Sequence, residues 1–273
     1  MRENRFMRKI LTAGLAIALM AGHSVAQAQT STQTADDDGA KNAKQARAVL
    51  DQMVQALGGQ AWLNMKNVER DGQVAAFFHG RPDLGTTAYF EFHQGPDHDR
   101  IEYSKHRDVV QFYVGRTGEE VTYKGKAALP QEQVDDYMRR RDHSIETVIK
   151  TWLNDPRTIL MYEGQRLAER HLADQVTLIS AENEAVTIQT DVQTHLPLRR
   201  TFQWRDPLYK DKNEEREEYD DYHVIDGIPT PYSITRFHNG DVTSQRYLYK
   251  AAYNVPLPPD AFNVDAAAAK VKK

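Results

Sequence analysis

The chain has 273 residues, a net charge of −4 with its histidines neutral, and no cysteine. Without cysteine it can form no disulfide and carry no lipid on an N-terminal cysteine, which excludes a lipid-anchored receptor of that kind. The acidic balance argues against nucleic acid as a partner.

The first 28 residues have the pattern of a secretory signal peptide. Basic side chains come first, an apolar run follows from residue 10 to 21, and Ala26-Gln27-Ala28 forms an A-x-A cleavage pattern. The apolar run is shorter than the roughly 20 residues of a transmembrane helix. We predict cleavage after Ala28 and a product free in the periplasm. Cleavage removes four basic side chains and one acidic one, which takes the net charge from −4 to −7.

Composition divides the rest of the chain into one domain with two loose ends. Residues 29–40 are polar and lack an apolar period, so we predict a disordered linker there. Residues 265–273, DAAAAKVKK, have nothing to bury, so we predict a flexible tail. Nothing between residues 41 and 264 has the composition of a linker, and we predict one domain over that range.

The first element of this domain is an amphipathic helix of about four turns, ended by Gly58-Gly59. Because the segment that follows is strand-like, we expect a sheet face to cover the apolar stripe of the helix. The stripe consists of Ala43, Ala46, Val49, Leu50, Met53, Val54 and Leu57.

Residues 68–123 alternate between apolar and polar side chains and predict five strands joined by short turns. Such alternation is typical of an antiparallel sheet with one covered face. We expect the apolar side chains to share that face and to line a ligand cavity: Val74, Phe78, Phe90, Phe92, Ile101, Tyr103, Phe112, Val114 and Tyr123.

A helical pattern spans residues 131–153 and is interrupted by a polar run, which indicates two helices. Placed between two blocks of strands, this segment either forms a lid over a curved sheet or is an ordinary helix that completes the core. Its apolar positions are Val134, Tyr137, Met138, Ile145, Val148, Ile149 and Trp152.

Strand patterns resume at residues 167–171, 176–178, 186–188, 198–204 and 212–224. A closing β-meander follows, with turns at Asp226-Gly227 and Asn239-Gly240. A sheet of about eleven strands is expected to curl. We therefore predict a mainly β (α+β) fold, in which a curved antiparallel half-barrel has helices covering its concave face.

No stretch of the sequence carries a strong catalytic or metal-binding motif, and we predict no cofactor. The group His93, Asp97, His98, Asp99 and His106 straddles a turn without compact zinc spacing. Ser144 beside His143 lacks the glycine-flanked elbow of a hydrolase. The charged run at 210–221 lacks the glycine and ligand order of a calcium loop, and we interpret it as a solvent-facing or edge strand.

Two segments resemble the LolA-like periplasmic lipoprotein carriers. The C-terminal segment matches their turn, hairpin and closing motif through Val224, Ile225, Asp226, Gly227, Ile228, Pro231, Asn254, Leu257, Pro258 and Phe262. The earlier segment matches their Pro, Arg, aromatic and hairpin pattern through Pro96, Arg100, Tyr103, Gly118 and Tyr123. One departure is the absence of the tryptophan usual in that hairpin, where Val121 is nearest.

The resemblance implies a monomeric carrier whose apolar cavity holds the acyl chains of a lipoprotein or lipid. It also implies an inner-membrane release complex and an outer-membrane acceptor as partners, and an arginine on the sheet that hydrogen-bonds into the lid. Arg100 is the candidate for this latch, and the alternative is that Arg100 pairs with Asp97 or Glu102.

Two other classes of function stay open. One is an interaction module that senses lipid or lipoprotein and transfers neither. The other is an enzyme acting on envelope lipid or glycan, which requires carboxylates or a histidine converging in the cavity. The sequence shows no such cluster.

Overall fold

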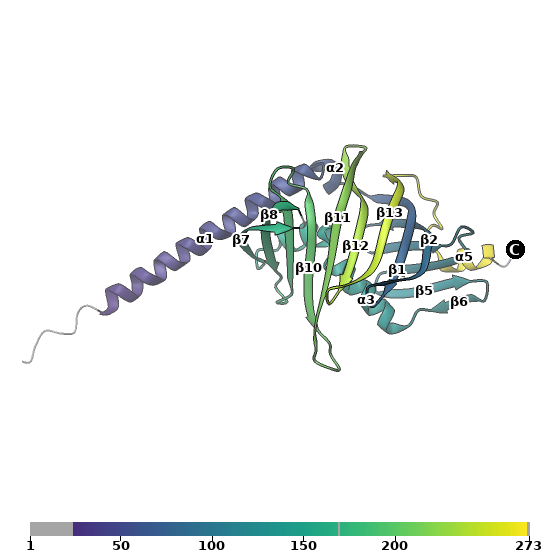
Figure 1. The fold of residues 1–273 in the computed structure, drawn as a ribbon, viewed down its shortest axis with the longest axis horizontal. Helices are drawn as coiled ribbons and strands as arrows, with labels where there is room; N and C mark the ends of the chain where they lie inside the picture. The colour runs from purple at the N-terminus through teal and green to yellow at the C-terminus, as the bar shows by residue number, and fades with distance from the viewer. Residues whose placement is uncertain (1–23, 169, 272–273) are drawn as a thin grey trace, which may run out of the picture. The chain divides into compact units, whose positions relative to one another are not determined.

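The computed structural model describes residues 24–168 and 170–271 (Figure 1). Residues 1–23, which hold most of the predicted signal peptide, lie outside the described residues. The described residues divide into two units, with the boundary between Lys41 and Asn42. Helix α1 (Ser24–Ala56) spans the boundary and includes residues 29–40, for which the sequence predicted a disordered linker. The Ala, Lys, Gln and Arg residues at 40–48 are strong helix formers, and helix growth from them requires no apolar stripe.

Within the described residues, thirteen strands form one sheet in which every neighbouring pair is antiparallel. Two meanders, β1 to β6 and β7 to β13, meet where β1 pairs with β13. The strands are β1 (Asn67–Phe78), β2 (Arg81–Gln94), β3 (His98–Tyr103), β4 (Val109–Val114), β5 (Thr117–Thr122), β6 (Gly125–Ala128), β7 (Ile159–Ala168), β8 (His171–Ile179), β9 (Ala185–Asp191), β10 (Pro197–Arg205), β11 (Lys212–Ile225), β12 (Ile228–His238) and β13 (Asp241–Tyr253).

The predicted curved, open sheet is confirmed, with two strands more than expected. The short strand β6 was missed, and residues 167–171, predicted as a strand, hold the end of β7 and the start of β8. Helix α1 is followed by α2 (Gln60–Leu63), and the two predicted helices of the central segment are α3 (Gln131–Asp142) and α4 (Ile145–Lys150). None of the helices in the described ranges is long and apolar enough to span a bilayer.

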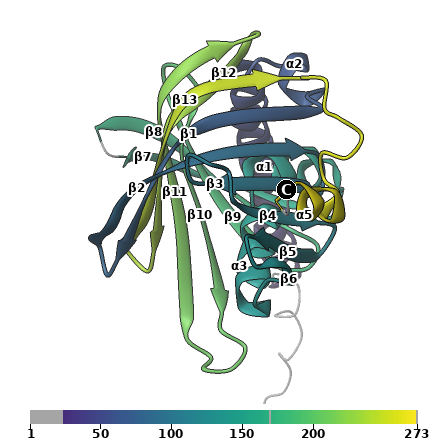
Figure 2. The ribbon, with the colours of Figure 1, turned by 90° about the vertical axis from the view of Figure 1, so that its right-hand side faces the viewer.

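The sheet curves around its helices, as Figure 2 shows, and one half of its concave face is filled by apolar side chains. In that half, the stripe of α1 and the inward side of α4 pack on β8, β9 and β10. The cluster includes Leu50, Met53, Val148, Ile149, Val176, Leu178, Val186, Ile188 and Phe202. The concave face over β8 and β9 is therefore occupied by core side chains.

Helix α3 packs over the other meander through a smaller apolar cluster. Its buried Val134 and Met138 contact Tyr113 of β4 and Leu129. The ring of Tyr137 stacks on Tyr113 with centroids 3.6 Å apart. The break between α3 and α4 comes at Ser144, whose Oγ caps α4 by accepting the N–H of Thr147 at 3.1 Å.

The convex face of β4 and β5 is also covered. Residues 264–271, predicted to belong mostly to a flexible tail, form helix α5 (Val264–Val271) and bury Ala267 against Val110, Phe112 and Val121. The prediction failed because a run of alanines looks featureless in sequence. Alanine is nonetheless the best helix former, and its small side chain allows close packing on an apolar strand.

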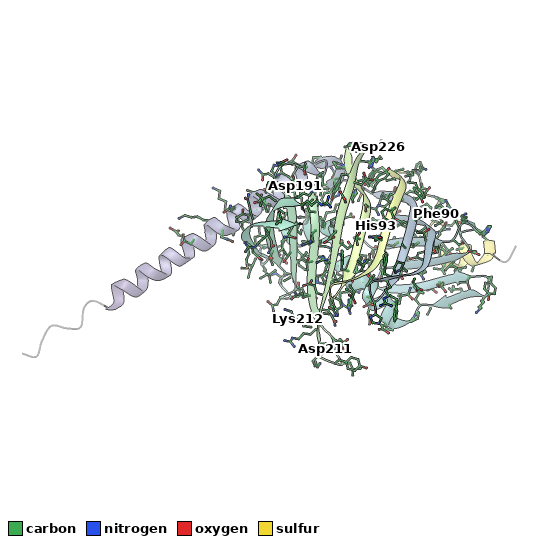
Figure 3. The ribbon with its side chains drawn as sticks, viewed as in Figure 1. Phe90, His93, Asp191, Asp211, Lys212 and Asp226 are labelled. Atoms are coloured by element: carbon green, nitrogen blue, oxygen red, sulfur yellow. The ribbon has the colours of Figure 1, made fainter. Side chains whose placement is uncertain are left out.

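The register of β2, β3 and β4 corrects the prediction that their aromatic side chains share one face. Ile101 is opposite Glu91, whereas Arg100 lies between Phe92 and Phe112 on the neighbouring strands. Because directly paired residues point to the same side, Ile101 and Tyr103 face the concave side, and Phe90, Phe92 and Phe112 face the convex side. Phe90 and His93, both labelled in Figure 3, are three residues apart on β2, so strand alternation places them on opposite faces. Both alternating sets of side chains on these strands include apolar residues because both faces of the sheet are covered here.

Strand β11 corrects the interpretation of the charged run at 210–221. It is an interior strand between β10 and β12, and Figure 3 labels Lys212 and Asp226 near its two ends. Glu215 and Glu217 on this strand are buried. The carboxylates were expected to face solvent, but arginines on neighbouring strands compensate them inside the protein.

Candidate functional site

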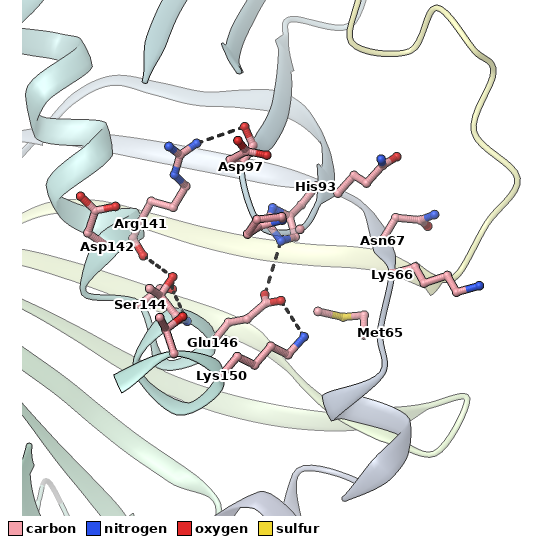
Figure 4. Close-up of a pocket in the computed structure, with 15 residues that line it drawn as sticks. Met65, Lys66, Asn67, His93, Asp97, Arg141, Asp142, Ser144, Glu146 and Lys150 are labelled. Carbon is pink, nitrogen blue, oxygen red and sulfur yellow. Dashed lines mark hydrogen bonds and ion pairs between the residues drawn. The ribbon is translucent and has the colours of Figure 1, made fainter. Parts of the chain in front are cut away.

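Two hollows lie beside the segment formed by α3 and α4. The larger, of about 760 Å³, opens near the end of β2 and is drawn in Figure 4. The smaller, of about 430 Å³, lies between α3 and the concave face. They share four lining residues, His93, Arg141, Ser144 and Glu146. Both volumes fall within the range of about 300–1,000 Å³ that is usual for small-molecule sites.

Only part of the predicted cavity lining reaches these hollows. Val74, Ile101 and Tyr103 line the smaller hollow. The other predicted residues line neither hollow: Phe78 and Tyr123 are exposed, Phe112 is buried beside α5, and Phe90, Phe92 and Val114 belong to the convex phase of their strands.

The predicted lid residues divide between two clusters. Val134 and Met138 pack with Tyr113, and Tyr137 also lines the smaller hollow. The side chains of α4 and the turn after it belong to the main core: Val148, Ile149, Ile145 and Trp152. The α3–α4 segment therefore covers the concave face, and its opening as a lid stays a prediction.

The wall between the two hollows is built around His93, a contact set that sequence analysis missed. The His93 Nδ1 lies 2.6 Å from Asp99 Oδ1. Its Nε2 lies 3.4 Å from Glu146 Oε2, the contact drawn in Figure 4. Burial alone lowers the pKa of His93, but the hydrogen bond to Asp99 and the contact with Glu146 outweigh burial and raise the pKa to about 9. His93 is therefore a cation at neutral pH that links the sheet to α4.

The same contact set shifts the pKa of Glu146 in the opposite direction. Burial alone raises that pKa, but the hydrogen bond and charge of His93, with Lys150 4 residues along α4, lower it to about 2. His93 and Asp99 are cross-strand partners in a tight hairpin, so their proximity is readable from the hairpin register. The approach of Glu146 depends on the packing of α4 and has no local signal.

The other side chains that the sequence suggested for metal or nucleophilic chemistry make contacts that serve neither role. His98 pairs with Asp97 at 2.9 Å, and no three His, Asp or Glu side chains in the described ranges come together as a metal site. Ser144 Oγ donates to Thr147 Oγ1 and accepts from the Thr147 N–H. The His143 ring contacts the Arg139 carbonyl instead of Ser144. Ser144 is therefore the N-cap of α4.

Polar contacts from three sides hold the α3–α4 segment to the sheet. Arg141 donates to the carbonyls of Asp97, at 3.3 Å, and Gly115. Arg200, which is fully buried on β10, donates to the carbonyl of His143 at 3.0 Å. Arg200 thus makes the bond into the helical segment that was predicted for Arg100.

Arg100 itself belongs to the convex face. It pairs with Glu102, donates to the Ala261 carbonyl at 2.9 Å, and lies over the rings of Phe92 and Phe112. The alternative prediction, pairing with Glu102, is the one confirmed. Arg100 therefore ties the C-terminal segment to β3 and takes no part in latching α3 or α4.

The smaller hollow has a charged floor, so the predicted apolar lining is wrong there. Glu217 Oε atoms lie 3.0 Å from Arg200, 2.8 Å from Arg236 and 3.4 Å from Arg246. Burial raises the pKa of Glu217, but these arginines outweigh it and hold the pKa well below its usual range. The arginines come from β10 and β12, which flank β11, and from β13, the strand beyond β12.

The fold is LolA-like: a curved, unclosed antiparallel sheet with helices on its concave face. The chain is similar to a DUF1329 family protein from Desulfovibrio piger, with a TM-score of 0.56 and 13% identity over 81% of this chain and 98% of that one. No protein-family model and no curated protein sequence matches the chain.

Two further solved structures share the fold. A LolA superfamily protein from Nitrosomonas europaea has a TM-score of 0.50 and 14% identity, with 81% of this chain and 98% of that chain covered. A putative outer membrane lipoprotein-sorting protein domain from Vibrio parahaemolyticus has a TM-score of 0.50 and 8% identity, with 87% and 99% covered. The fold expected from the sequence resemblance is confirmed, and at these identities the similarity concerns the fold alone.

Proposed function

We propose that this protein is a periplasmic carrier that holds an amphipathic lipid, or the acyl chains of a lipoprotein, between its curved sheet and the α3–α4 segment. The observation that carries the proposal is the pair of hollows, about 760 and 430 Å³, that share a wall beside this segment. The shared fold with a putative lipoprotein-sorting domain supports it.

The apolar surface for an acyl chain comes from the underside of α3. In the closed structure Val134 and Met138 are buried against Tyr113, and Ile101 is packed beside them. An outward movement of α3 exposes the apolar side chains of α3 and those of the sheet beneath it to a ligand. The acyl chain of the ligand then gains about 0.8 kcal/mol per buried CH₂ group. Ligand uptake therefore competes with lid closure for the same apolar surface.

The chemistry of the site favours binding over catalysis. A general base must accept a proton near neutral pH, whereas His93 already holds its proton between two carboxylates. Ser144 is occupied as a helix cap. A carrier additionally requires a donor and an acceptor, and we propose an inner-membrane release complex and an outer-membrane acceptor in these roles.

Binding can be tested with N-phenyl-1-naphthylamine, a neutral apolar fluorophore, added to the purified protein. We expect saturable binding at micromolar concentration and displacement by a fatty acid. The Val74→Asp variant, which places a carboxylate on the wall of the smaller hollow, should bind the probe about tenfold more weakly. Val224→Asp is the matched control because Val224 is exposed and lines neither hollow.

Absence of saturable probe binding, or equal affinity of the Val74→Asp variant and the wild type, overturns the proposal. Mass spectrometry of molecules that copurify from the native envelope identifies the ligand. Recovery of lipid from the wild type, with less lipid from Val74→Asp than from Val224→Asp, is the expected result.

A further inference from the structure

Four arginines converge on two buried carboxylates beside the smaller hollow. Three of them contact Glu217, at 2.8 to 3.4 Å, and the fourth, Arg140 of α3, lies 3.6 Å from Glu215. We call this set the arginine cluster: Arg140, Arg200, Arg236 and Arg246, with Glu215 and Glu217.

The arginine cluster carries two more positive than negative charges. The other charged side chains on the wall of the smaller hollow balance one another, since Arg70 pairs with Glu91 at 3.2 Å and the cations His93 and Arg141 face Asp99 and Glu146. Asp136, four residues before Arg140 on α3, pairs with Arg139 at 2.6 Å, and its charge also acts on Arg140. All four arginines have a carboxylate partner, yet two positive charges remain in excess around a partly enclosed hollow, which favours the binding of an anion there.

Two arginines of the cluster present their guanidinium groups to open space. Arg140 and Arg236 retain 25% and 23% of their side-chain exposure, and with Ser244 they line both the smaller hollow and a third hollow of about 350 Å³. Burial lowers the pKa of Arg140, and the neighbouring charge of Arg236 lowers it further. The two guanidinium groups therefore repel each other across an accessible gap.

Buried donors without partners face the same hollow. The hydroxyl of Tyr89 has no hydrogen-bond partner although the residue is only 3% exposed. The Nε of Arg200 is likewise unpartnered. Oxygens of a bound anion would give these donors the partners that buried polar groups usually have, whereas the unpartnered Oε1 of Glu215 on β11 is an acceptor and would not pair with an anion.

We propose that the arginine cluster binds the oxyanion of the ligand, a phosphate or carboxylate group, between Arg140 and Arg236. Guanidinium groups bind such oxygens with paired N–H donors, which makes arginine the usual residue for this task. The inference rests on the proposed carrier function and specifies its cargo as an anionic amphiphile, with the charged group in the smaller hollow and the chain under α3.

The test compares three soluble probes by isothermal titration calorimetry with the purified protein. They are dihexanoyl phosphatidic acid, dihexanoyl phosphatidylcholine, which carries no net charge, and inorganic phosphate. We expect phosphatidic acid to bind at least tenfold more tightly than phosphatidylcholine, because hydrogen bonds to charged groups contribute strongly when buried. Binding of inorganic phosphate as tight as that of phosphatidic acid indicates a free anion as the source.

The variant Arg140→Gln should lose about tenfold in affinity for phosphatidic acid and leave the affinity for phosphatidylcholine unchanged. It should fold, since the substitution relieves the repulsion with Arg236. Arg139→Gln is the matched control: Arg139 is the adjacent residue of α3, carries the same charge, and lines none of the three hollows. Arg236→Gln should reproduce the effect from the opposite side of the gap.

Each outcome separates this inference from the carrier proposal. Equal affinity for the charged and neutral lipids overturns the inference and leaves the carrier proposal standing. Binding of inorganic phosphate without binding of either lipid or of N-phenyl-1-naphthylamine overturns the carrier proposal and supports the anion site. Equal losses in Arg139→Gln and Arg140→Gln also overturn the inference, because they show a general effect of net charge.

Discussion

The docking of α3 on the sheet can be tested at Gly118, which has no side chain where β5 passes under the helix. A Cβ added at Gly118 meets Cγ2 of Val134 at 2.6 Å and Cδ1 of Leu129 at 3.2 Å. The first distance is well inside van der Waals contact. Because Val134 is buried and cannot retreat, Gly118→Ala must push α3 away from β5.

The magnitudes follow from the packing. Overpacking a filled core costs about 1–3 kcal/mol. Val134→Ala alone removes two buried methyl groups and costs about 2 kcal/mol. In the double variant the new Cβ occupies space that Val134 has vacated, so the two effects should cancel in part. We expect the loss in free energy of unfolding to be about 1–2 kcal/mol smaller than the sum of the single losses.

The assay is urea unfolding of the four proteins, followed by circular dichroism. The coupling energy is the quantity of interest, because effects of alanine on the backbone of β5 cancel in the cycle. Additive losses, within about 0.5 kcal/mol, contradict the docking of α3 on Gly118. If α3 is also a lid, Gly118→Ala should raise the affinity for N-phenyl-1-naphthylamine by up to about tenfold, since the closed state is weakened.

Three further predictions concern ionic and packing contacts. The pKa of His93, about 9, lies above its ordinary 6.5. Protonated His93 should therefore contribute up to about 3 kcal/mol to the free energy of unfolding below pH 6.5, and this contribution should vanish as the pH rises through 9. Urea unfolding of His93→Gln should lack that pH dependence, and an unchanged profile contradicts the assignment. Phe112→Ala should lose about 3–5 kcal/mol in thermal or urea unfolding with unaltered probe affinity, because Phe112 packs beside α5. Arg200→Lys should leave the His143 carbonyl without its donor, destabilise α4 by about 1–3 kcal/mol, and speed hydrogen exchange of its amides; unchanged exchange argues against the contact.

The sequence predicts elements well where local chemistry determines them. The apolar period of residues 43–57 defines the part of α1 that packs on the sheet, and Asp226-Gly227 and Asn239-Gly240 correctly mark the turns of the final meander. Each of these signals lies within a few residues of the feature it predicts. The same holds for the polar run from Arg139 to Ser144, which predicted two helices and ends at the break between α3 and α4.

The site depends on partners distant in sequence, and there prediction failed. Alternation in β2 correctly places Phe90 and His93 on opposite faces. It does not tell which of the two faces is concave, because α5 covers the convex face and makes it apolar as well. Glu217 was assigned to a solvent-facing strand because carboxylates are seldom buried. Its arginine partners lie on three other strands, so their meeting is decided by strand order in the whole sheet.

The pairing of β1 with β13 makes the middle of the sheet the last part that a growing chain can complete. Each meander pairs strands that are neighbours in sequence, so its pairings close short loops of chain. The pairing of Val68 with Tyr253 instead closes a loop that spans nearly the whole domain. Until β13 emerges, β1 presents an unpaired edge that can recruit strands from other chains. Truncation before residue 241 should therefore yield aggregates, and folding of the intact chain should be limited in rate by formation of this seam.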